Sequence, residues 1–396
     1  MALTPSLTLR SVLEAVAALG TVGSLFFYLL SALGMSSFLA DKSKKLKQPP
    51  PDPFPPVTIL KPLKGIDPEI WDSFCSHCEQ DYPEFQLIFG VSDSGDPAIE
   101  MVRKLQAKYP SLPIELVVCD RVLGTNIKVS NLAQMLPAAR HEILLVNDSD
   151  IRVPVDYLRN VLTPLHDASV GLVTCLYRGV AGPTVGSRLE ALGIGTDFMP
   201  GVLSARFLER GLHFGLGSTL AFRRRDLEAI GGFEALLDYL ADDYELGRRI
   251  AATGKRVELS AATVATFLPA YTLRDFSRHQ LRWSRTSRDA RRWGYTGLLL
   301  TFGLPWALIT LLAARGAAWA WLLFALTFAL RLAVGLVAAV VVLHDRQIFR
   351  NIYLLPLRDL IAPFIWAVSF MGNRIHWRGD TFVLKDGKLI RPGAPR

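Results

Sequence analysis

The sequence predicts an α/β protein with a mostly parallel sheet and transmembrane helices at both ends. Two observations carry this prediction: the 396-residue chain has long uncharged segments near both termini, and the polar block between them alternates short apolar runs with helical patterns. Such alternation is typical of a parallel sheet with helices on both faces. The order of segments divides the chain into an N-terminal anchor with a basic flank (1–48), a proline-rich linker (49–56), an α/β domain (57–275), a basic interfacial helix (276–292), transmembrane or re-entrant helices (293–373) and a basic tail (374–396).

The N-terminal anchor is predicted to cross a membrane. Residues 15–40 carry no charge, and this run exceeds the roughly 20 apolar residues that span a hydrocarbon core. A cleaved signal peptide fits less well, because it would have a shorter apolar region and a small-residue cleavage site. Four lysines follow between residues 42 and 47, and the positive-inside rule then places the α/β domain in the cytosol. The prolines of the linker predict a stiff spacer that holds this domain off the bilayer.

Three apolar segments follow residue 292. Residues 293–314 and 317–343 predict two spans, and Arg331 is the single charge within the second. A charge at mid-depth is costly and usually faces the bundle or a watery cavity. We therefore expect Arg331 either to face that interior and meet a lipid or phosphate, or to extend to the interface. The third segment, 352–370, contains two prolines and two charged residues, which predicts a broken or re-entrant helix. The basic tail favours a cytosolic end.

Composition narrows the classes of partner. Hydrophobic residues make up 50% of the chain and the formal charge is +8, with lysine and arginine concentrated beside the apolar segments. This distribution favours an anionic lipid bilayer. No nucleic-acid-binding motif accompanies it, so we expect no nucleic-acid partner. Of four cysteines, Cys75 and Cys78 have a close spacing but no second pair to complete a metal site, and reduced cytosolic thiols are expected.

Acidic residues follow two of the predicted strands. Four short apolar runs are expected to form strands, at 57–60, 87–91, 114–118 and 143–146, with helical patterns between them at 68–78, 97–109 and 129–136. In parallel sheets, ligands bind at the carboxyl ends of the strands. Asp93 comes directly after the second run and Asp148 after the fourth, which predicts a site at this edge.

The carboxylates Asp148 and Asp150 have the chemistry of a metal site. Two oxygen ligands at alternate positions can hold Mg²⁺ or Mn²⁺, and the ion would bridge the phosphates of a nucleotide diphosphate. An acidic turn after a strand is the alternative, and for Asp93 an ordinary Asp-Gly turn is the alternative. Lys128, in the loop before the fourth run, is either a cation for the nucleotide or a solvated charge at a helix start.

Two later clusters are candidates for catalysis. Asp242 and Asp243 precede a helical run, where they either cap the helix or form a carboxylate pair with raised proton affinity, suited to a general base. Arg282 and Trp283 lie in a stripe of arginines that leads into the first C-terminal apolar segment. This stripe is either a membrane-interface anchor or a cationic face that neutralises a departing diphosphate.

Together these motifs resemble the ceramide glucosyltransferase family, glycosyltransferase family 21, including bacterial relatives that add N-acetylglucosamine to hopanoids. The similarity covers residues 57–283 and the membrane layout. The motifs that carry it are Lys61-Pro-Leu-Lys-Gly65, the Asp93 turn, Asp96-Pro-Ala98, Asp148-Ser-Asp150-Ile-Arg-Val153, Gly171-Leu-Val173, Gly231-Gly232, Asp242-Asp243-Tyr244 and Leu281-Arg-Trp283.

The resemblance implies a GT-A fold and an inverting membrane enzyme that uses a UDP-sugar and a divalent metal. It assigns Asp93 to the nucleotide, Asp148 and Asp150 to the metal and diphosphate, Asp243 to the base, and Arg282 and Trp283 to the diphosphate and acceptor. One position departs from the family pattern, because His279 stands where Gln or Arg is usual.

The implied reaction moves one sugar to the hydroxyl of a membrane lipid, from UDP-glucose to ceramide. The alternative reaction moves N-acetylglucosamine from UDP-N-acetylglucosamine to a hopanoid polyol such as bacteriohopanetetrol. In either reaction, residues 187–207 are expected either to admit the lipid as an interfacial helix or to form a core helix. A processive polysaccharide synthase fits less well, because the chain has few spans for a translocation channel. A non-catalytic UDP-sugar binding protein would not need Asp243.

Overall fold

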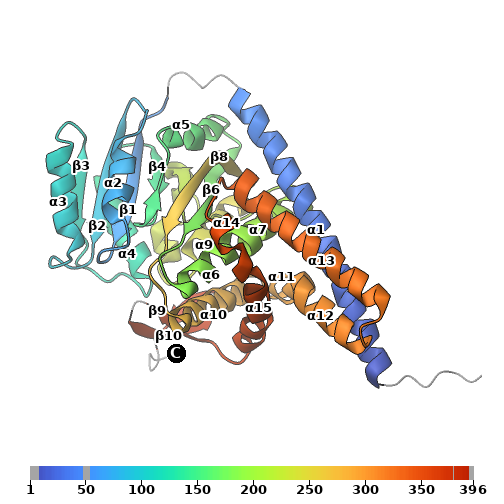
Figure 1. Ribbon diagram of the computed structural model, residues 1–396. Coiled ribbons are helices and arrows are strands. Elements are labelled where there is room, and N and C mark those ends of the chain that lie inside the picture. The colour runs from blue at the N-terminus through green and yellow to red at the C-terminus, as the bar shows by residue number, and fades with distance from the viewer. Residues whose placement is uncertain (1–8, 48–53, 378, 392–396) are drawn as a thin grey trace, which may run out of the picture.

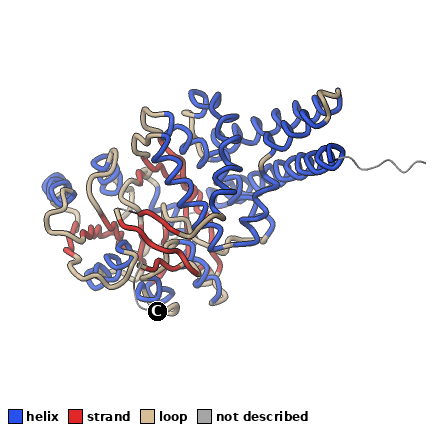
Figure 2. Tube along the Cα trace, turned by 90° about the horizontal axis from the view of Figure 1, so that it is seen from below, coloured by secondary structure: helices blue, strands red, loops and turns tan. Residues whose placement is uncertain are grey.

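The computed structural model of the protein describes residues 9–47, 54–377 and 379–391. An α/β domain lies at one end of the molecule, and long helices from both termini project from it (Figure 1). Viewed along a perpendicular direction, the strands are gathered in the domain and the projecting part consists of helices joined by short loops (Figure 2). Residues 49–53 of the predicted proline-rich linker lie outside the described residues.

The parallel half of the main sheet matches the sequence prediction. The eight strands lie in the order β3-β2-β1-β4-β7-β6-β8-β5, and β3, β2, β1 and β4 run parallel to one another. Strands β1 and β2 are in register from Val57 opposite Phe85 to Leu63 opposite Val91, so their carboxyl ends are level. The bounds are β1 Val57–Leu63, β2 Phe85–Val91, β3 Ile114–Val118 and β4 Ile143–Val146. The helices between them are α2 Ile70–Cys78, α3 Ala98–Lys108 and α4 Ile127–Met135.

The second half of the sheet mixes directions. Strand β7 (Leu220–Arg223) runs antiparallel to both β4 and β6 (Val170–Val180), whereas β6 and β8 (Arg256–Phe267) are parallel. The short strand β5 (Ile151–Arg152) closes this edge antiparallel to β8. The core is buried between the sheet and its helices, which include α5 Tyr157–Leu162 and α9 Asp242–Ala252.

The N-terminal helix α1 (Leu9–Lys47) packs directly against the domain. A Cβ on Gly34 would lie 2.6 Å from the carbonyl oxygen of Leu203 in α7 (Met199–Leu208), so only glycine permits this approach. Met35 and Phe38 belong to the same apolar core as the strands. The predicted anchor is therefore not separate from the domain, because α1 supplies part of the core.

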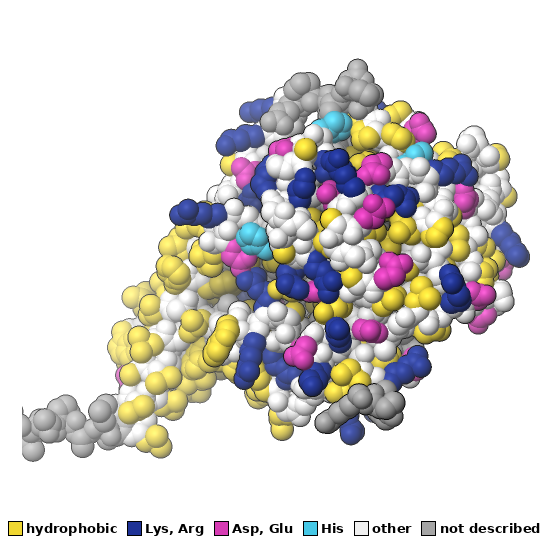
Figure 3. Space-filling model, turned by 180° about the vertical axis from the view of Figure 1, so that it is seen from behind, with side chains coloured by type: hydrophobic (Ala, Val, Ile, Leu, Met, Phe, Trp, Pro, Cys, Tyr) yellow, Lys and Arg dark blue, Asp and Glu magenta, His cyan; other side chains and the backbone are white. Residues whose placement is uncertain are grey.

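Three helices are long and apolar enough to cross a membrane: Leu9–Lys47, Ala318–Val342 and Ile348–Ser369. Apolar side chains cover the projecting part of the surface (Figure 3). The predicted span over 293–314 comprises α11 (Arg292–Gly297) with its 3₁₀ extension and α12 (Gly303–Ala313), and the two pieces are bent by 50° relative to each other. Pro305 cannot donate the backbone hydrogen bond that would join the two pieces. Most of the segment expected to be broken, 352–370, lies in the helical stretch Ile348–Ser369, which is long enough to span a membrane. A 3₁₀ turn at Ile352–Leu354 interrupts this stretch.

The predicted basic tail folds, through residue 391, into a small antiparallel sheet. Strands β9 (Arg374–Trp377), β10 (Asp380–Lys385) and β11 (Lys388–Ile390) form it. It packs on the segment just before α9: Leu240 N donates to Gly387 O at 3.0 Å, and Leu389 N donates to Asp238 O at 2.7 Å. The tail is thus part of the domain, because its apolar side chains cover Leu240.

Candidate active site

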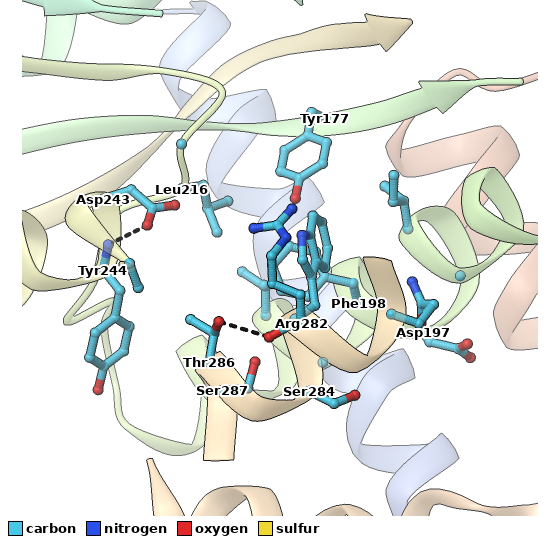
Figure 4. A pocket seen from close by; sticks show the side chains of 18 of the residues that line it. Tyr177, Asp197, Phe198, Leu216, Asp243, Tyr244, Arg282, Ser284, Thr286 and Ser287 are labelled. Atoms are coloured by element: carbon cyan, nitrogen blue, oxygen red, sulfur yellow. Dashed lines mark hydrogen bonds between the residues drawn. The ribbon is translucent and has the colours of Figure 1, made fainter. Parts of the chain in front are cut away.

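A single cavity of about 1020 Å³ joins the sheet edge to the membrane helices. Its lining includes Asp148 and Asp243 from the domain, and Phe27 of α1 and Trp366 of α15 (Leu355–Ser369) from the helices. Figure 4 shows the part of this cavity around Arg282, with Asp243 on one side and Asp197 on the other. The arrangement gives one space both a polar acidic end and an apolar wall.

A buried lysine joins the two acidic clusters that the sequence predicted. Lys128 Nζ lies 2.8 Å from Asp148 Oδ1 and 3.2 Å from Asp242 Oδ2. Asn126 accepts from Val129 N at the start of α4, and its Nδ2 donates to Asp242 Oδ1 at 3.3 Å. Burial alone would lower the pKa of Lys128, but the surrounding carboxylates outweigh it and raise that pKa. The alternative of a solvated lysine is wrong, since its side chain is only 12% exposed.

Asp243 faces Asp148 across a glycine. A Cβ on Gly217 would lie 3.0 Å from Asp243 Oδ2 and 3.4 Å from Asp148 Oδ2, so the glycine leaves the space between the carboxylates open. Asp243 Oδ1 accepts from Tyr244 N at 2.8 Å, in the first turn of α9. Burial, reinforced by the adjacent Asp242, raises the pKa of Asp243 to about 6 although Lys128 opposes the increase. A carboxyl with this pKa can accept a proton near neutral pH.

Asp150 is more enclosed than Asp148. It accepts a hydrogen bond from Thr266 Oγ1 of β8, and burial, with the Asp148 charge, raises the pKa of Asp150 to about 6. Asp148 is 41% exposed in its side chain. Across the described ranges, no group of three or more His, Cys, Asp or Glu side chains is placed to hold a metal. The pair fits Mg²⁺ or Mn²⁺ only if diphosphate oxygens and water complete the coordination, which is how Mg²⁺ is usually bound.

The turn that carries Asp148 and Asp150, the candidate metal ligands, packs on a buried polar cluster that the sequence analysis did not predict. Lys61 of β1 is fully buried, and its Nζ donates to Asp148 O at 2.9 Å. Burial lowers the pKa of Lys61 to about 7. His77 Nε2 lies 3.5 Å from Lys61 Nζ and 3.3 Å from Asn147 Oδ1. The signal in the sequence was a lysine inside an otherwise apolar strand.

Arg282 and Trp283 reach the cavity from helix α10 (Leu273–Ala290). A capping box at Thr272 and Asp275 starts this helix, before the predicted residue 276. Arg282 points toward Tyr177 (Figure 4). The Trp283 ring lies 5.5 Å from the Phe198 ring, between their centroids. Arg282 and Trp283 thus lie at the cavity wall rather than only at a membrane interface.

His279 pairs with a buried carboxylate that the sequence did not indicate. Its Nδ1 lies 3.0 Å from Glu190 Oε1, and Gln280 Nε2 donates to Glu190 Oε2 at 2.9 Å. Glu190 is fully buried in α6 (Val185–Gly193). The His279 ring also lies 5.3 Å from the Trp283 ring, between their centroids. The unusual residue of the motif therefore anchors α10 to α6.

Asp93 lies apart from these residues. Its Oδ1 accepts from Gly95 N at 2.8 Å within its own exposed turn, and it is not among the side chains that line the cavity. The turn follows β2 at the predicted edge of the sheet. Its role as a nucleotide contact stays a prediction.

Arg331 is neither extended to an interface nor open to a lipid phosphate. Its Nε and Nη2 each donate to Asp359 at 2.8 Å, and Nη1 donates to Thr196 O at 2.9 Å. A further ion pair joins Arg331 to Asp197 at 2.5 Å. Arg331 therefore faces the interior of the helix bundle and borders the cavity, as one expectation had it, but two carboxylates of the neighbouring segments neutralise it in place of a lipid or phosphate. The region 187–207 spans α6, a π-helical turn (Ile194–Phe198) and α7, which line the cavity while packing in the core.

The fold defines a class of enzyme. The structure resembles that of the mannosyltransferase PcManGT from Pyrobaculum calidifontis in complex with GDP-Man and Mn²⁺, with a TM-score of 0.52 over 91% of this chain and 99% of that one. The two sequences are 23% identical, so the likeness concerns the fold. The protein has the GT-A glycosyltransferase fold that the sequence predicted.

The chain belongs to glycosyl transferase family 21, whose model matches residues 24–390. Ceramide glucosyltransferase 1 of Caenorhabditis elegans is 24% identical over 97% of this chain and 83% of its own length. The ceramide glucosyltransferase of Candida albicans is 36% identical over 28% of this chain and 22% of its own length. These findings confirm the family and establish a membrane hexosyltransferase.

Proposed function

We propose that the protein transfers glucose from UDP-glucose to a hydroxyl of ceramide, in one inverting step at the cytosolic membrane face. The observation that carries this proposal is the single cavity, which is lined both by Asp148 and Asp243 and by the membrane helices. A lipid hydroxyl can reach the base from the bilayer while a charged donor enters from water. The names of the family relatives support ceramide as the acceptor.

Asp243 acts as the general base in this proposal. It accepts the proton of the lipid hydroxyl as the hydroxyl oxygen attacks the anomeric carbon of the sugar. The bond from that carbon to the diphosphate oxygen breaks, and UDP leaves with the electron pair. The raised pKa of Asp243, to about 6, leaves it ionised at neutral pH yet basic enough to accept the proton.

The remaining residues hold charge in place. Lys128 fixes Asp148 and Asp242 through its two contacts, and Arg282 supplies a cation at the cavity wall for the departing diphosphate. Asp148 and Asp150 would hold a divalent cation, which neutralises diphosphate charge when bound. Trp283, whose ring lies beside that of Phe198, gives the acceptor an apolar surface.

The test uses purified protein in lipid nanodiscs with radiolabelled donor. UDP-glucose with ceramide should place label in the organic phase as a lipid carrying one sugar. A parallel reaction with UDP-N-acetylglucosamine and bacteriohopanetetrol tests the alternative pair, and preference for it would overturn the ceramide assignment. A water-soluble polymer would support a processive synthase instead. Release of free sugar alone would contradict transfer to any lipid.

A further inference from the structure

Two cations meet at one loop where the membrane helices join the domain. His344 lies in the loop 343–347, which follows the helix α13 (Ala318–Leu336) and its π-helical extension. Lys42 Nζ, near the C-terminal end of α1, lies 3.4 Å from His344 Nε2. Arg178 Nη1, near the end of β6, donates to His344 O at 2.5 Å. Cations from two distant segments therefore reach the same residue.

The groups that hold these two cations carry no negative charge. Arg178 binds a backbone carbonyl, and Lys42 faces an imidazole ring. Burial, and then the charges of Lys42 and Arg178, lower the pKa of His344, so this ring is uncharged at neutral pH. Among the described residues, no carboxylate lies within ion-pairing distance of either cation. Asp345 is buried, and its Oδ1 accepts from a backbone N–H of the same loop at 2.8 Å. Asp156 acts on Lys42 only from a greater distance.

Neighbouring cations do have carboxylate partners. Lys45, also in α1, has its Nζ 2.6 Å from Glu258 Oε2. Arg206 pairs with Asp41, the residue that precedes Lys42. The chain therefore neutralises these two cations, whereas Lys42 remains available to an anion from outside the chain.

The loop lies at the level of a membrane surface. Both α1 and the stretch Ala318–Val342 are long and apolar enough to cross a membrane, and the C-terminal ends of both lie beside the domain (Figure 1). Tyr353, in the helical stretch that follows the loop, is exposed, and tyrosine is enriched at membrane–water interfaces. The headgroups of lipids occupy this level of a bilayer.

We propose that Lys42 and Arg178, together with the loop 343–347, bind the phosphate of an anionic phospholipid in the leaflet nearest the domain. The phosphate oxygens accept from the ammonium of Lys42 and from the remaining guanidinium N–H groups of Arg178, in charge-assisted hydrogen bonds. A zwitterionic headgroup fits less well, because its own cation would lie beside these two. The bound lipid joins the end of α1 to the end of α13. None of these residues lines the cavity, so this inference does not depend on the proposed transfer reaction.

The experiment uses the full chain in phosphatidylcholine nanodiscs that contain a minor fraction of phosphatidylglycerol with a photoreactive headgroup. Light should attach this probe to the segment 332–346, identified by mass spectrometry after digestion with trypsin. Unlabelled phosphatidylglycerol should compete with the probe, and zwitterionic phosphatidylethanolamine should not. Inorganic phosphate should not compete either, because acyl chains hold only the lipid headgroup at the membrane surface.

The variants change charges outside the segment that is measured. Lys42→Gln/Arg178→Gln should lower attachment to this segment about tenfold, because two cations that face the phosphate are lost. Lys42→Gln alone keeps the bond from Arg178 to His344 O and should lower the attachment about threefold. The matched control is Lys44→Gln/Lys47→Gln, which removes two exposed lysines from the same end of α1. It should keep the attachment within about twofold of wild type, since exposed charges at a distance are screened.

The melting temperature of each variant checks that the fold persists, and the single variant decides if the double variant does not fold. The proposal is wrong if the wild-type segment takes up no probe, or if the folded Lys42 variants take it up like wild type. An equal loss in the Lys44→Gln/Lys47→Gln control would also contradict it, because that result indicates diffuse attraction to a basic helix end. Competition by inorganic phosphate would assign the site to a free anion and overturn the lipid assignment.

Discussion

At the scale of single residues, the environment of Asp243 is the clearest link between structure and chemistry. Burial makes its carboxylate harder to ionise, and Lys128 limits that effect. If Asp243 is the base, Asp243→Asn should reduce kcat by roughly 10² to 10⁴-fold. Binding of UDP-glucose, measured by calorimetry, should persist because the donor does not depend on this proton acceptor. Near-normal turnover in the variant would contradict the assignment of Asp243 as the general base.

The same residue predicts a pH dependence. The base must be ionised, so kcat/KM should be constant well above pH 6 and fall as the pH drops through the pKa of Asp243, about 6. Below that value the decline should approach tenfold per pH unit. The measurement is a pH profile of glucosyl transfer at subsaturating ceramide. A profile that stays flat down to pH 5 would exclude a base with this pKa.

Asp148 carries the prediction about the metal. Asp148→Ala should weaken UDP-glucose binding about tenfold or more in the presence of Mn²⁺, because one of the two carboxylates that hold the ion is lost. The control is Glu115→Ala. Glu115 lies on the edge strand β3, and its partly exposed carboxylate pairs with Arg140. Wild-type activity that survives a chelator unchanged would contradict the metal role.

The sequence indicated the charged residues of the site but did not indicate all the residues that contact them. Asp148, Asp242 and Asp243 stood out because carboxylates at strand or helix ends are chemically distinctive. Lys61 opened one of the motifs but gave no sign of its burial or partners, and Glu190 did not stand out, because it lies in a run whose neighbours form ordinary buried structure. Their pairing depends on segments far apart in the chain, which no local pattern encodes.

At the scale of elements, the parallel strands were predictable and the rest of the sheet was not. The run at 143–146 is apolar throughout, as strands covered on both faces are. Strand β8 contains small and polar residues and gives no such signal. Pro305 marks the bend before α12 locally, but the packing of the bend against α1, where a Cβ on Gly303 would lie 2.3 Å from Tyr28 Oη, joins residues far apart in the chain.

The small C-terminal sheet predicts an effect on catalysis from outside the cavity. Gly387 has φ 78° and contacts Tyr239, next to the segment that leads into α9. Gly387→Ala should lower kcat about threefold or more, because a strain of roughly 1 kcal/mol displaces this segment. Gly379→Ala is the matched control: it has φ 95° in the same sheet, but a Cβ there has no neighbour within 4 Å. Equal effects in both variants would show that the contact with Tyr239 does not matter.

At the scale of the whole molecule, the helices and the domain form one unit. Lys45, one of the lysines that predicted the orientation, pairs with Glu258 of the domain at 2.6 Å. The opposite end of α1 lies beside the turn between α12 and α13 (Ala318–Leu336), where Arg10 Nε donates to Ala313 O at 2.8 Å. The two ends of the helical layer therefore present different surfaces, and a bilayer between them would separate the domain from that turn (Figure 1).

This separation predicts which positions are accessible from outside the cell. Lys104→Cys lies on the exposed surface of α3 in the domain, and Arg315→Cys lies in the exposed turn between α12 and α13. The four native cysteines are buried, so background labelling should be low. In sealed right-side-out vesicles, a membrane-impermeant maleimide should label Arg315→Cys and spare Lys104→Cys, because the positive-inside rule predicts that the lysines at the C-terminal end of α1 lie in the cytosol together with the domain. Permeabilised vesicles provide the control, in which both should react. Labelling of Lys104→Cys before permeabilisation would place the domain on the outer face, where a cytosolic nucleotide sugar could not reach it.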